Sequence, residues 1–332
     1  MTKTPKLSIV VPCYNEESCL VELHARLGAA ARLIAPDDYE IVLINDGSRD
    51  QTWPIMLDLV KTDTRLTIIN LSRNHGHQLA LTAGLDLCRG DLILIVDADL
   101  QDPPELVEPM LATMVAENAD VVYGLRYNRE GETMFKKWTA AAFYRILAGA
   151  TDIAIPVDTG DFRLMTRRAL AVFLAMPEQS RFVRGMVAWA GFRQVPYRYE
   201  RSERFAGDSK YPLSKMISFA FDALTGFSSA PLKLASHAAL ILSIGSVLLM
   251  AYILVSWFAG QSIQGWASLM LVVVMLGAIQ MFVLSMIGEY LGRLYSQSKQ
   301  RPLYIVQDVV GGTVGQATLG INVAQASTDL SR

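Results

Sequence analysis

A long stretch of this 332-residue chain lacks charge: no Asp, Glu, Lys or Arg occurs from Leu234 to Gly288. With 52% hydrophobic and 19% charged residues, the chain is too apolar for an ordinary soluble enzyme. The stretch divides near Gly260, and its two parts, about 234–258 and 266–288, are each long enough to cross a hydrocarbon core of about 30 Å as a helix. We therefore expect a two-helix transmembrane hairpin over 233–292. The competing interpretation is a buried helical hairpin of a soluble protein.

Lysine and arginine are also missing from the loop between the two expected spans, whereas Lys233 precedes the first span and Arg293 follows the second. Because positive charge accumulates on the cytoplasmic side, this pattern predicts that the large N-terminal part of the chain and both termini are cytoplasmic. The protein is thus expected to be a multi-pass protein of the inner (plasma) membrane. No signal peptide is expected, since the first apolar run, Leu7–Val11, is short and leads directly to Pro12.

Cysteine is scarce, and the three that occur, Cys13, Cys19 and Cys88, are odd in number and lack metal-ligand spacing. They are typical of reduced cytosolic thiols. The net charge of −2 leaves no basic stripe for a nucleic acid, so no such partner is expected. Beyond about residue 311 the composition of Gly, Thr, Ala, Gln and Ser predicts a disordered tail.

Strand-like and helix-like segments alternate over the first 126 residues. The expected strands are Leu7–Val11, Tyr39–Asn45, Leu66–Leu71, Ile93–Val96 and Asp120–Tyr123, and the expected helices are 18–33, 50–62, 77–88 and 104–117. This order predicts an α/β fold with a mainly parallel sheet and helices on both faces. Later segments are a helix at 133–148, a polar cluster at 158–165 and an edge strand at 195–200.

The expected organisation has four parts. A cytoplasmic catalytic domain covers 1–212, the transmembrane hairpin covers 233–292, and a cytoplasmic C-terminal segment covers 293–332. Between the first two, 213–232 forms a juxtamembrane amphipathic helix, because its apolar residues recur at helical spacing. Such a helix can lie at the membrane interface or pack against the catalytic domain, and the sequence leaves both open.

Asp97 and Asp99 follow the expected strand Ile93–Val96 at a spacing of two. Strand residues two apart point to the same side, so their carboxylates can converge beyond the carboxyl end of the strand, where open α/β sheets bind ligands. Two oxygen ligands there suit Mg²⁺ or Mn²⁺ and, through it, a diphosphate. The alternative is an acidic turn that caps the next helix, which begins near Pro104.

Two further expected strands end in polar residues. Tyr14 and Glu16 follow the first strand, and Asp46 follows the second. Since these strand ends meet at one edge of a parallel sheet, the aromatic ring and the carboxylates can stack on and bind a base and ribose while a metal holds the phosphates.

Several motifs resemble those of family-2 glycosyltransferases with the A-type fold, and more closely the polyisoprenyl-phosphate branch, which includes dolichol-phosphate mannose synthase and undecaprenyl-phosphate sugar transferases. The resemblance extends from Leu7 to about Ile305 and includes the two expected spans; Asn45 departs from it, since many members carry an aspartate there. The matching segments are 11–16, 45–48, 73–80, 97–104, 158–164 and 206–211.

The resemblance implies roles for individual residues. The nucleotide would be bound by Pro12, Tyr14, Glu16, Asp46 and Asp97, and the divalent cation, Mg²⁺ or Mn²⁺, by Asp99 and Gln101. Arg204 and Lys210 would close over the donor diphosphate, although basic residues near a membrane also bind anionic headgroups. Arg126 and Lys137 would bind the lipid phosphate. Asp161 lies where inverting members place a catalytic carboxylate; it would act as a base, orient sugar hydroxyls, or fix Arg163.

The resemblance therefore implies an inverting transfer of a sugar from a nucleoside diphosphate sugar, with UDP favoured, to a polyprenyl phosphate, with undecaprenyl phosphate favoured, at the cytoplasmic membrane face. It also implies a homo-oligomer. The alternatives are a membrane-bound polysaccharide synthase and an inactive membrane scaffold or translocator. The first lacks support because Gln179 is followed by Ser-Arg-Phe, not by the Gln-x-x-Arg-Trp of such synthases, and the second because the expected spans contain little beyond His237 and Gln280 that is polar.

Overall fold

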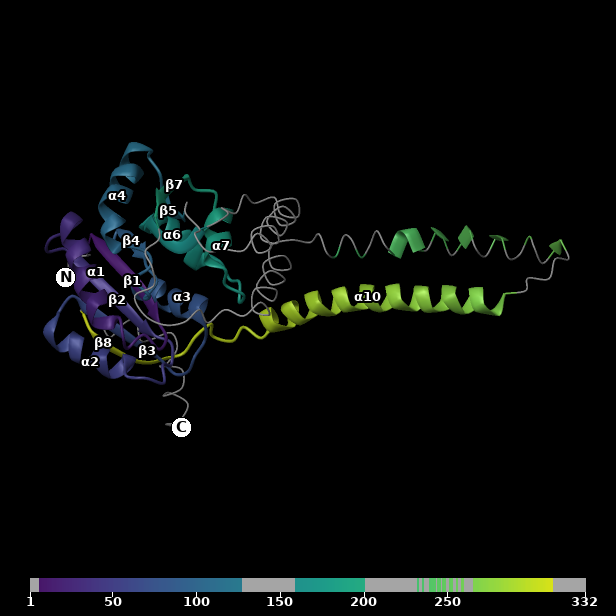
Figure 1. The fold of residues 1–332 in the computed structure, drawn as a ribbon, viewed down its shortest axis with the longest axis horizontal. Coiled ribbons are helices and arrows are strands. Elements are labelled where there is room, and N and C mark those ends of the chain that lie inside the picture. Colours follow the sequence, from purple (N-terminus) through teal and green to yellow (C-terminus); the bar gives the residue numbers. More distant parts are fainter. Residues whose placement is uncertain are drawn as a thin grey trace, which may run out of the picture. The chain divides into compact units, whose positions relative to one another are not determined.

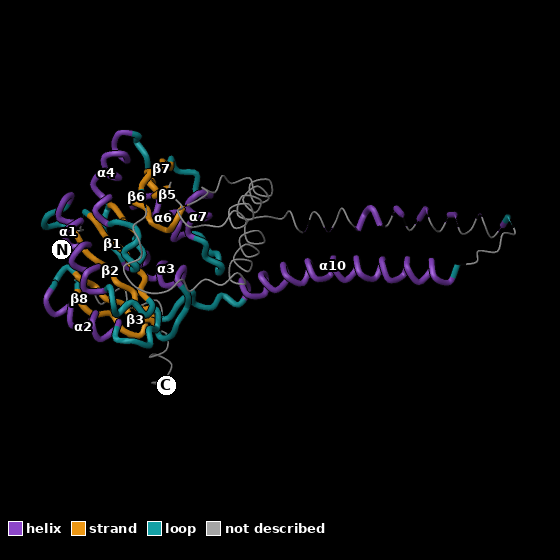
Figure 2. Tube along the Cα trace, viewed as in Figure 1, coloured by secondary structure: helices purple, strands orange, loops and turns teal. Residues whose placement is uncertain are grey.

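The computed structural model describes residues 6–126, 159–200 and 265–312, with scattered positions between 232 and 259. The chain divides into two compact units, and residues from 301 onward belong to the same unit as the N-terminal domain. Figure 1 shows that this first unit contains all the labelled strands, and Figure 2 shows its helices beside them. Every proposed site residue described below lies in this unit.

The described strands form one eight-stranded sheet in the order β7-β5-β6-β4-β1-β2-β3-β8. Six strands run in one direction, whereas β6 and β8 run antiparallel to their neighbours, which confirms the expected mainly parallel sheet. The strands are β1 (Leu7–Cys13), β2 (Tyr39–Asn45), β3 (Leu66–Leu71), β4 (Leu92–Ile95), β5 (Val121–Arg126), β6 (Thr159–Thr166), β7 (Gln194–Tyr199) and β8 (Val306–Gly311).

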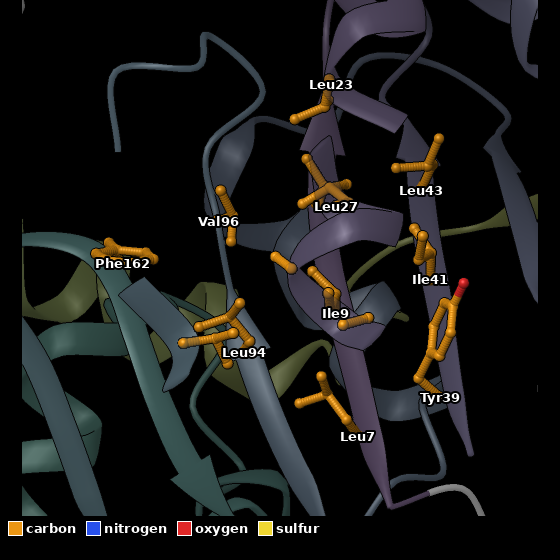
Figure 3. Packing of buried hydrophobic residues seen from close by; sticks show 14 of the residues in the cluster. Leu7, Ile9, Leu23, Leu27, Tyr39, Ile41, Leu43, Leu94, Val96 and Phe162 are labelled. Atoms are coloured by element: carbon orange, nitrogen blue, oxygen red, sulfur yellow. The ribbon is translucent and has the colours of Figure 1, made fainter. Parts of the chain in front are cut away.

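Alternate residues of the central strands pack against helices on opposite faces of the sheet. Ile9 and Ile41 belong to the buried cluster that Leu23 and Leu27 of one helix complete, and Figure 3 shows this packing. On the other face, a second helix approaches β1 and β2 so closely that a Cβ on Gly84 would lie 2.4 Å from Ile44 Cδ1. Because both faces are covered, β1 and β2 are buried along their whole length.

The helices of this unit lie mostly where the sequence predicts them. They are α1 (Leu20–Ile34), α2 (Thr52–Thr62), α3 (His77–Leu87), a 3₁₀ turn η1 (Pro104–Leu106), α4 (Val107–Ala116), α6 (Arg167–Ala175) and α7 (Val183–Trp189). The strand after α1, which is β2, and the strand after α2, which is β3, begin and end at the predicted residues, Tyr39–Asn45 and Leu66–Leu71.

Two strands were not predicted. The segment expected to be a polar cluster at 158–165 is the buried strand β6, and β8 follows the apolar region and pairs with β3. The expected edge strand is confirmed as β7 at one margin of the sheet, and β8 forms the other margin.

The second unit contains α10 (Trp266–Ser298), which includes the second expected span. Within it, Val272–Ser298 is long and apolar enough to cross a membrane, and the apolar window is not buried inside the protein. Of the first expected span, only scattered residues are described, and those from Ala235 to Phe258 are helical. The expected helix at 133–148, the expected helix at 213–232 apart from its last residue, and the tail beyond 312 lie outside the described residues.

Candidate active site

The register of the sheet brings four chain segments to one edge. The carboxyl ends of β4, β1 and β2 are neighbours, as the sequence predicts. Because β6 runs antiparallel to β4 and Arg163 pairs with Ile95, the first residues of β6 lie beside those that follow β4. This pairing places Asp161 near Asp97, and α3 begins at the same edge with His77.

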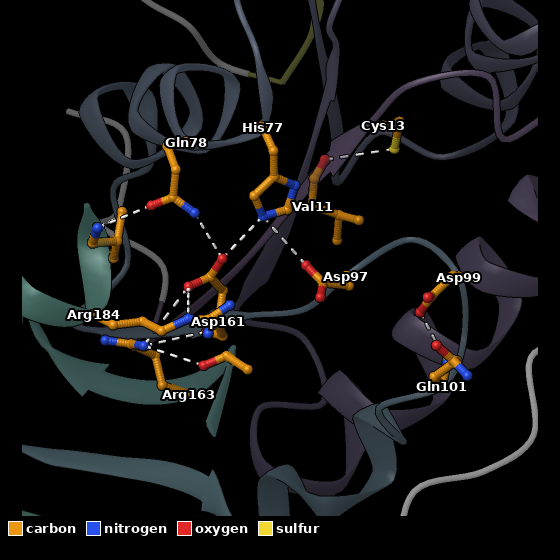
Figure 4. A network of polar contacts seen from close by, with 12 residues as sticks. Val11, Cys13, His77, Gln78, Asp97, Asp99, Gln101, Asp161, Arg163 and Arg184 are labelled. Carbon is orange, nitrogen blue, oxygen red and sulfur yellow. Dashed lines mark hydrogen bonds and ion pairs between the residues drawn. The ribbon is translucent and has the colours of Figure 1, made fainter. Parts of the chain in front are cut away.

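The Asp161 carboxylate is bonded on both oxygens. Its Oδ2 contacts His77 Nε2 at 3.1 Å and accepts a hydrogen bond from Gln78 Nε2 at 2.8 Å. Its Oδ1 accepts from Arg184 Nε at 2.9 Å, and the Arg163 guanidinium lies 3.9 Å from it. The Asp161 side chain is 2% exposed, and Figure 4 shows the surrounding groups pointing toward it. The geometry therefore holds the carboxylate in one orientation.

The two central members of this network have shifted pKa values. Burial by itself would raise the pKa of Asp161, but Arg184, His77 and Arg163 hold it well below its ordinary value. Burial would lower the pKa of His77, yet the hydrogen bond to Asp161 and the charges of Asp97 and Asp161 raise it to about 9. Asp161 is thus ionised and His77 protonated at neutral pH.

The pKa of Asp97, unlike that of Asp161, lies above its ordinary value. Burial, and then the charges of Asp161, Asp102 and Asp99, raise its pKa to about 6, against the lowering effect of His77. Its Oδ1 is buried without a hydrogen bond among the described residues, and His77 Nε2 is 3.5 Å away.

Asp99 and Gln101 lie together in that turn, where the Gln101 N–H donates to Asp99 Oδ1 at 3.2 Å. Strand alternation does not set the relation between Asp97 and Asp99, because β4 ends at Ile95, before both residues, and their convergence on one cation stays a prediction. Figure 4 shows the Asp97 carboxylate toward His77 and Asp99 beside Gln101. Leu100 between them has a φ of 59°, an uncommon conformation for a branched apolar residue.

Two sets of side chains could hold a divalent cation. His77, Asp97 and Asp161 have ligand atoms within 4.8 Å of one another, but guanidinium groups already compensate Asp161. The turn that carries Asp99 and Gln101 offers a carboxylate and an amide, both with oxygen ligand atoms. Mg²⁺ and Mn²⁺ prefer oxygen ligands, so the residues of this turn fit the cation better.

The expected nucleotide-binding residues occupy two adjoining turns. Tyr14 is exposed, Glu16 is half-buried, and Pro12 is buried within β1. Asp46 is 2% exposed and accepts hydrogen bonds from the backbone N–H groups of His75, at 2.7 Å, and Gly76, at 3.0 Å. Burial raises the pKa of Asp46 although these hydrogen bonds oppose the rise. Asp46 therefore fixes the 73–76 loop, and its contact with a nucleotide stays a prediction.

Four predicted residues have side chains outside the described part of the structure. Arg126 ends β5, where its backbone pairs with Tyr199, but its side chain is not described. Lys137, Arg204 and Lys210 lie entirely outside the described residues. Their assignment to the lipid phosphate and the donor diphosphate rests on the sequence.

Three residues of the Asp161 network were not predicted as such. His77, Gln78 and Arg184 are not among the site residues that the sequence indicates. Gln78 also accepts a hydrogen bond from the Val183 N–H at 2.9 Å, so it joins α3 to α7. One local signal could have located the strand that carries Asp161. Polar Asp161 and Arg163 alternate with apolar Phe162 and Leu164, a pattern that is typical of a strand.

Comparison with known proteins agrees with this geometry. Residues 8–173 match the family model described as Glycosyl transferase family 2. An uncharacterized glycosyltransferase of Bacillus subtilis (strain 168) is 46% identical, covering 94% of this chain and 96% of that protein. A prophage bactoprenol glucosyl transferase homolog of Escherichia coli (strain K12) is 35% identical, covering 92% and 99%.

The resemblance to the polyisoprenyl-phosphate branch is thereby confirmed. Among solved structures, mannosyl-3-phosphoglycerate synthase from Rubrobacter xylanophilus is similar with a TM-score of 0.48 and 19% identity, covering 70% of this chain and 75% of that one.

Proposed function

The chain belongs to glycosyl transferase family 2 and is a glycosyltransferase, and from this premise we propose that its acceptor is a polyprenyl phosphate. The proposed donor is a nucleoside diphosphate sugar, with UDP favoured, and the favoured acceptor is undecaprenyl phosphate. The sugar is transferred with inversion at its anomeric carbon, at the cytoplasmic face of the inner membrane. Support for the acceptor comes from relatives named bactoprenol glucosyl transferases, which are similar over more than nine-tenths of this chain.

The observation that carries the proposal is the meeting of Asp97, the 97–102 turn and the network around Asp161 at one sheet edge. A donor diphosphate needs a cation site and a nucleoside site side by side, and the turns with Tyr14 and Asp46 adjoin this edge. The ordered, charge-balanced carboxylate of Asp161 is suited to holding sugar hydroxyl groups in a fixed orientation.

In the proposed reaction, an oxygen of the lipid phosphate attacks the anomeric carbon while the bond from that carbon to the diphosphate breaks. A phosphate monoester has a second pKa of about 6, so the nucleophile is already largely a dianion at neutral pH. Asp161 does not need to remove a proton, and its lowered pKa makes it a weak base. We propose that it orients the donor sugar.

A divalent cation bound by Asp99 and Gln101 would neutralise the charge that develops on the departing diphosphate. The residues of this chain supply the remaining functions. Arg126 and Lys137 are proposed to bind the acceptor phosphate, and Arg204 and Lys210 are proposed to close over the donor. The apolar helix α10 is proposed to anchor the enzyme beside its lipid acceptor.

The direct test uses the purified full-length chain in detergent or vesicles, with undecaprenyl phosphate, UDP-glucose and Mg²⁺ or Mn²⁺. We expect release of UDP together with a glycosylated lipid whose anomeric configuration is opposite to that of the donor. A panel of other nucleotide sugars, including GDP-mannose, identifies the donor. Hydrolysis of the donor, in which UDP is released and the sugar is transferred only to water, with no glycosylated lipid for any donor, would contradict the proposed acceptor.

The metal assignment predicts that Asp99→Ala loses metal-dependent turnover, because a ligand to the cation contributes several kcal/mol of transition-state stabilisation. Asp91→Ala is the matched control, since Asp91 is an exposed carboxylate immediately before β4, at the opposite end of that strand. We expect both variants to keep the melting temperature of the parent and only Asp99→Ala to lose activity. Parent-like kcat for Asp99→Ala at saturating Mg²⁺ and Mn²⁺ would refute the assignment.

A further inference from the structure

Three polar residues form one continuous rung across the margin of the sheet. Asn45 of β2 pairs in register with Asn70 of β3, and Asn70 pairs with Asp308 of β8. The Asn70 Nδ2 donates to Asp308 Oδ2 at 3.2 Å, and the Asn45 Nδ2 donates to Asn70 Oδ1 at 2.8 Å. Asp308 is thus linked through Asn70 to β2, the strand that leads into the Asp46 turn.

The order of donors along this rung is set at its outer end. An ionised carboxylate only accepts hydrogen bonds, so Asn70 must turn its NH₂ group toward Asp308 and its oxygen toward Asn45. Asn45 must then present its NH₂ group to Asn70 and its oxygen inward. That oxygen accepts the Ser48 N–H at 3.2 Å. Asn45 is 3% exposed, so an amide turned the wrong way would leave buried polar groups without partners.

The same hydrogen bonds continue into the second nucleotide-binding turn. Ser48 Oγ accepts the Asn15 N–H at 3.0 Å, and Asn15 Oδ1 accepts the Arg49 N–H at 2.8 Å. Asn15 has a φ of 56° and lies between Tyr14 and Glu16. The conformation of this turn therefore depends on where Ser48 is held.

We propose that Asp308 is a positioning residue of the nucleotide site. Through Asn70 and Asn45 it fixes the 45–48 turn, and with it the Tyr14–Glu16 turn, in the conformation that binds a nucleoside diphosphate. This inference rests on the proposed function, because it assigns these turns to the donor. Asp308 does not touch the reacting groups, so its effect falls on donor binding and leaves acceptor binding unchanged.

The test reverses the polarity of the rung in the full-length protein. In Asp308→Lys a donor replaces the acceptor, so Asn70 must turn its oxygen outward and its NH₂ group then faces that of Asn45. We expect binding of UDP or GDP, measured by calorimetry, to weaken by about threefold to tenfold, the equivalent of one net hydrogen bond. The donor KM should rise in proportion, while kcat and the acceptor KM stay within about twofold, a smaller change than loss of one hydrogen bond gives.

Two variants serve as controls. Asp308→Asn can keep an oxygen toward Asn70 and should bind nucleotide like the parent. Gln307→Lys adds a lysine to the same exposed strand beside the rung and should also be unchanged. If the lysine variant does not fold, Asp308→Ala removes the acceptor without adding charge and is compared in its place.

Parent-like nucleotide affinity of Asp308→Lys would overturn the inference, as would equal losses in Asp308→Asn or Gln307→Lys. A parallel rise of donor and acceptor KM would also overturn it, because it would indicate a general structural role. If the parent protein itself binds neither UDP nor GDP, the proposed function fails and this inference fails with it. Nucleotide binding that Asp308 does not influence leaves the proposed function intact.

Discussion

The carboxylate of Asp161 lies between two guanidinium groups, a protonated imidazole and an amide, and almost no water reaches it. We expect Asp161→Asn to lower the free energy of unfolding by about 3–5 kcal/mol, because it leaves Arg163 and part of Arg184 buried without a counter-charge. Denaturant unfolding measures the change. Glu117→Gln, which makes the same substitution in an exposed pair with Arg193, should cost less than about 1 kcal/mol.

The stability of Asp161→Asn also decides how a loss of activity in this variant is interpreted. A stable, inactive Asp161→Asn protein that still binds both substrates would contradict the orienting role and restore Asp161 as a general base. A variant that loses stability and activity together would agree with the network described here.

His77 makes the stability of the folded protein decrease as the pH rises. Because its pKa is raised in the folded protein to about 9, its stabilising contribution is complete below the unfolded value of about 6.5 and is lost as pH rises toward 9. We expect the melting temperature to fall over this interval. In His77→Gln the fall should be smaller, because the group whose pKa is raised is absent. A parental slope in His77→Gln would contradict the assignment.

At the scale of elements, the turn after β2 and the loop before α3 are held in contact. Gly47 has a φ of 63°, and a Cβ there would lie 2.5 Å from Asn74 N and 2.6 Å from the carbonyl carbon of Arg73. We expect Gly47→Ala to displace the 73–76 loop, break its hydrogen bonds to Asp46 and lower stability by about 2–4 kcal/mol, more than the left-handed conformation alone requires.

Gly191→Ala is the control for this effect. Its φ of 74° imposes a similar backbone penalty, but the nearest atom to its Cβ is 3.9 Å away. Its cost should therefore be about 1–2 kcal/mol, with unchanged nucleotide affinity. Equal losses in both alanine variants, measured by denaturant unfolding and nucleotide titration, would show that contact with the loop is unimportant.

The elements that sequence reasoning located are those with local signals. β2 and β3 are short apolar runs between polar turns, and their bounds were predicted correctly. β6 was missed because its residues were interpreted as a polar cluster, although Thr159, Asp161 and Arg163 are buried within the sheet. β8 was missed because it is short and pairs with a strand that is far away in the sequence.

The same distinction applies to the site. Asp97, Asp99, Asp46 and Tyr14 follow strand ends, so their grouping follows from the order of parallel strands. His77, Gln78 and Arg184 reach Asp161 from α3 and α7, and only the packing of these helices brings them together. Sequence reasoning thus found the edge at which the donor is proposed to bind but missed the groups that fix Asp161.

At the scale of the whole molecule, β8 makes the first unit depend on residues that follow the apolar helix. A chain that ends near Pro231 retains every predicted catalytic residue but leaves the β3 edge unpaired. We expect it to melt at a lower temperature, to aggregate, and to bind nucleotide poorly. A chain that ends at Gly312 keeps β8 and should bind nucleotide like the full-length protein. Parental stability of the shorter chain in solution would contradict this prediction.

β8 also has a consequence for the order in which the molecule is made. Asn70 and Asp308 are 238 residues apart, so β3 leaves the ribosome long before its neighbour exists. At about 5–20 residues per second, the delay is roughly 10–50 s. During this interval α10 is synthesised while one margin of the sheet is still open to other chains. This margin of the sheet can therefore close only after α10 has been synthesised.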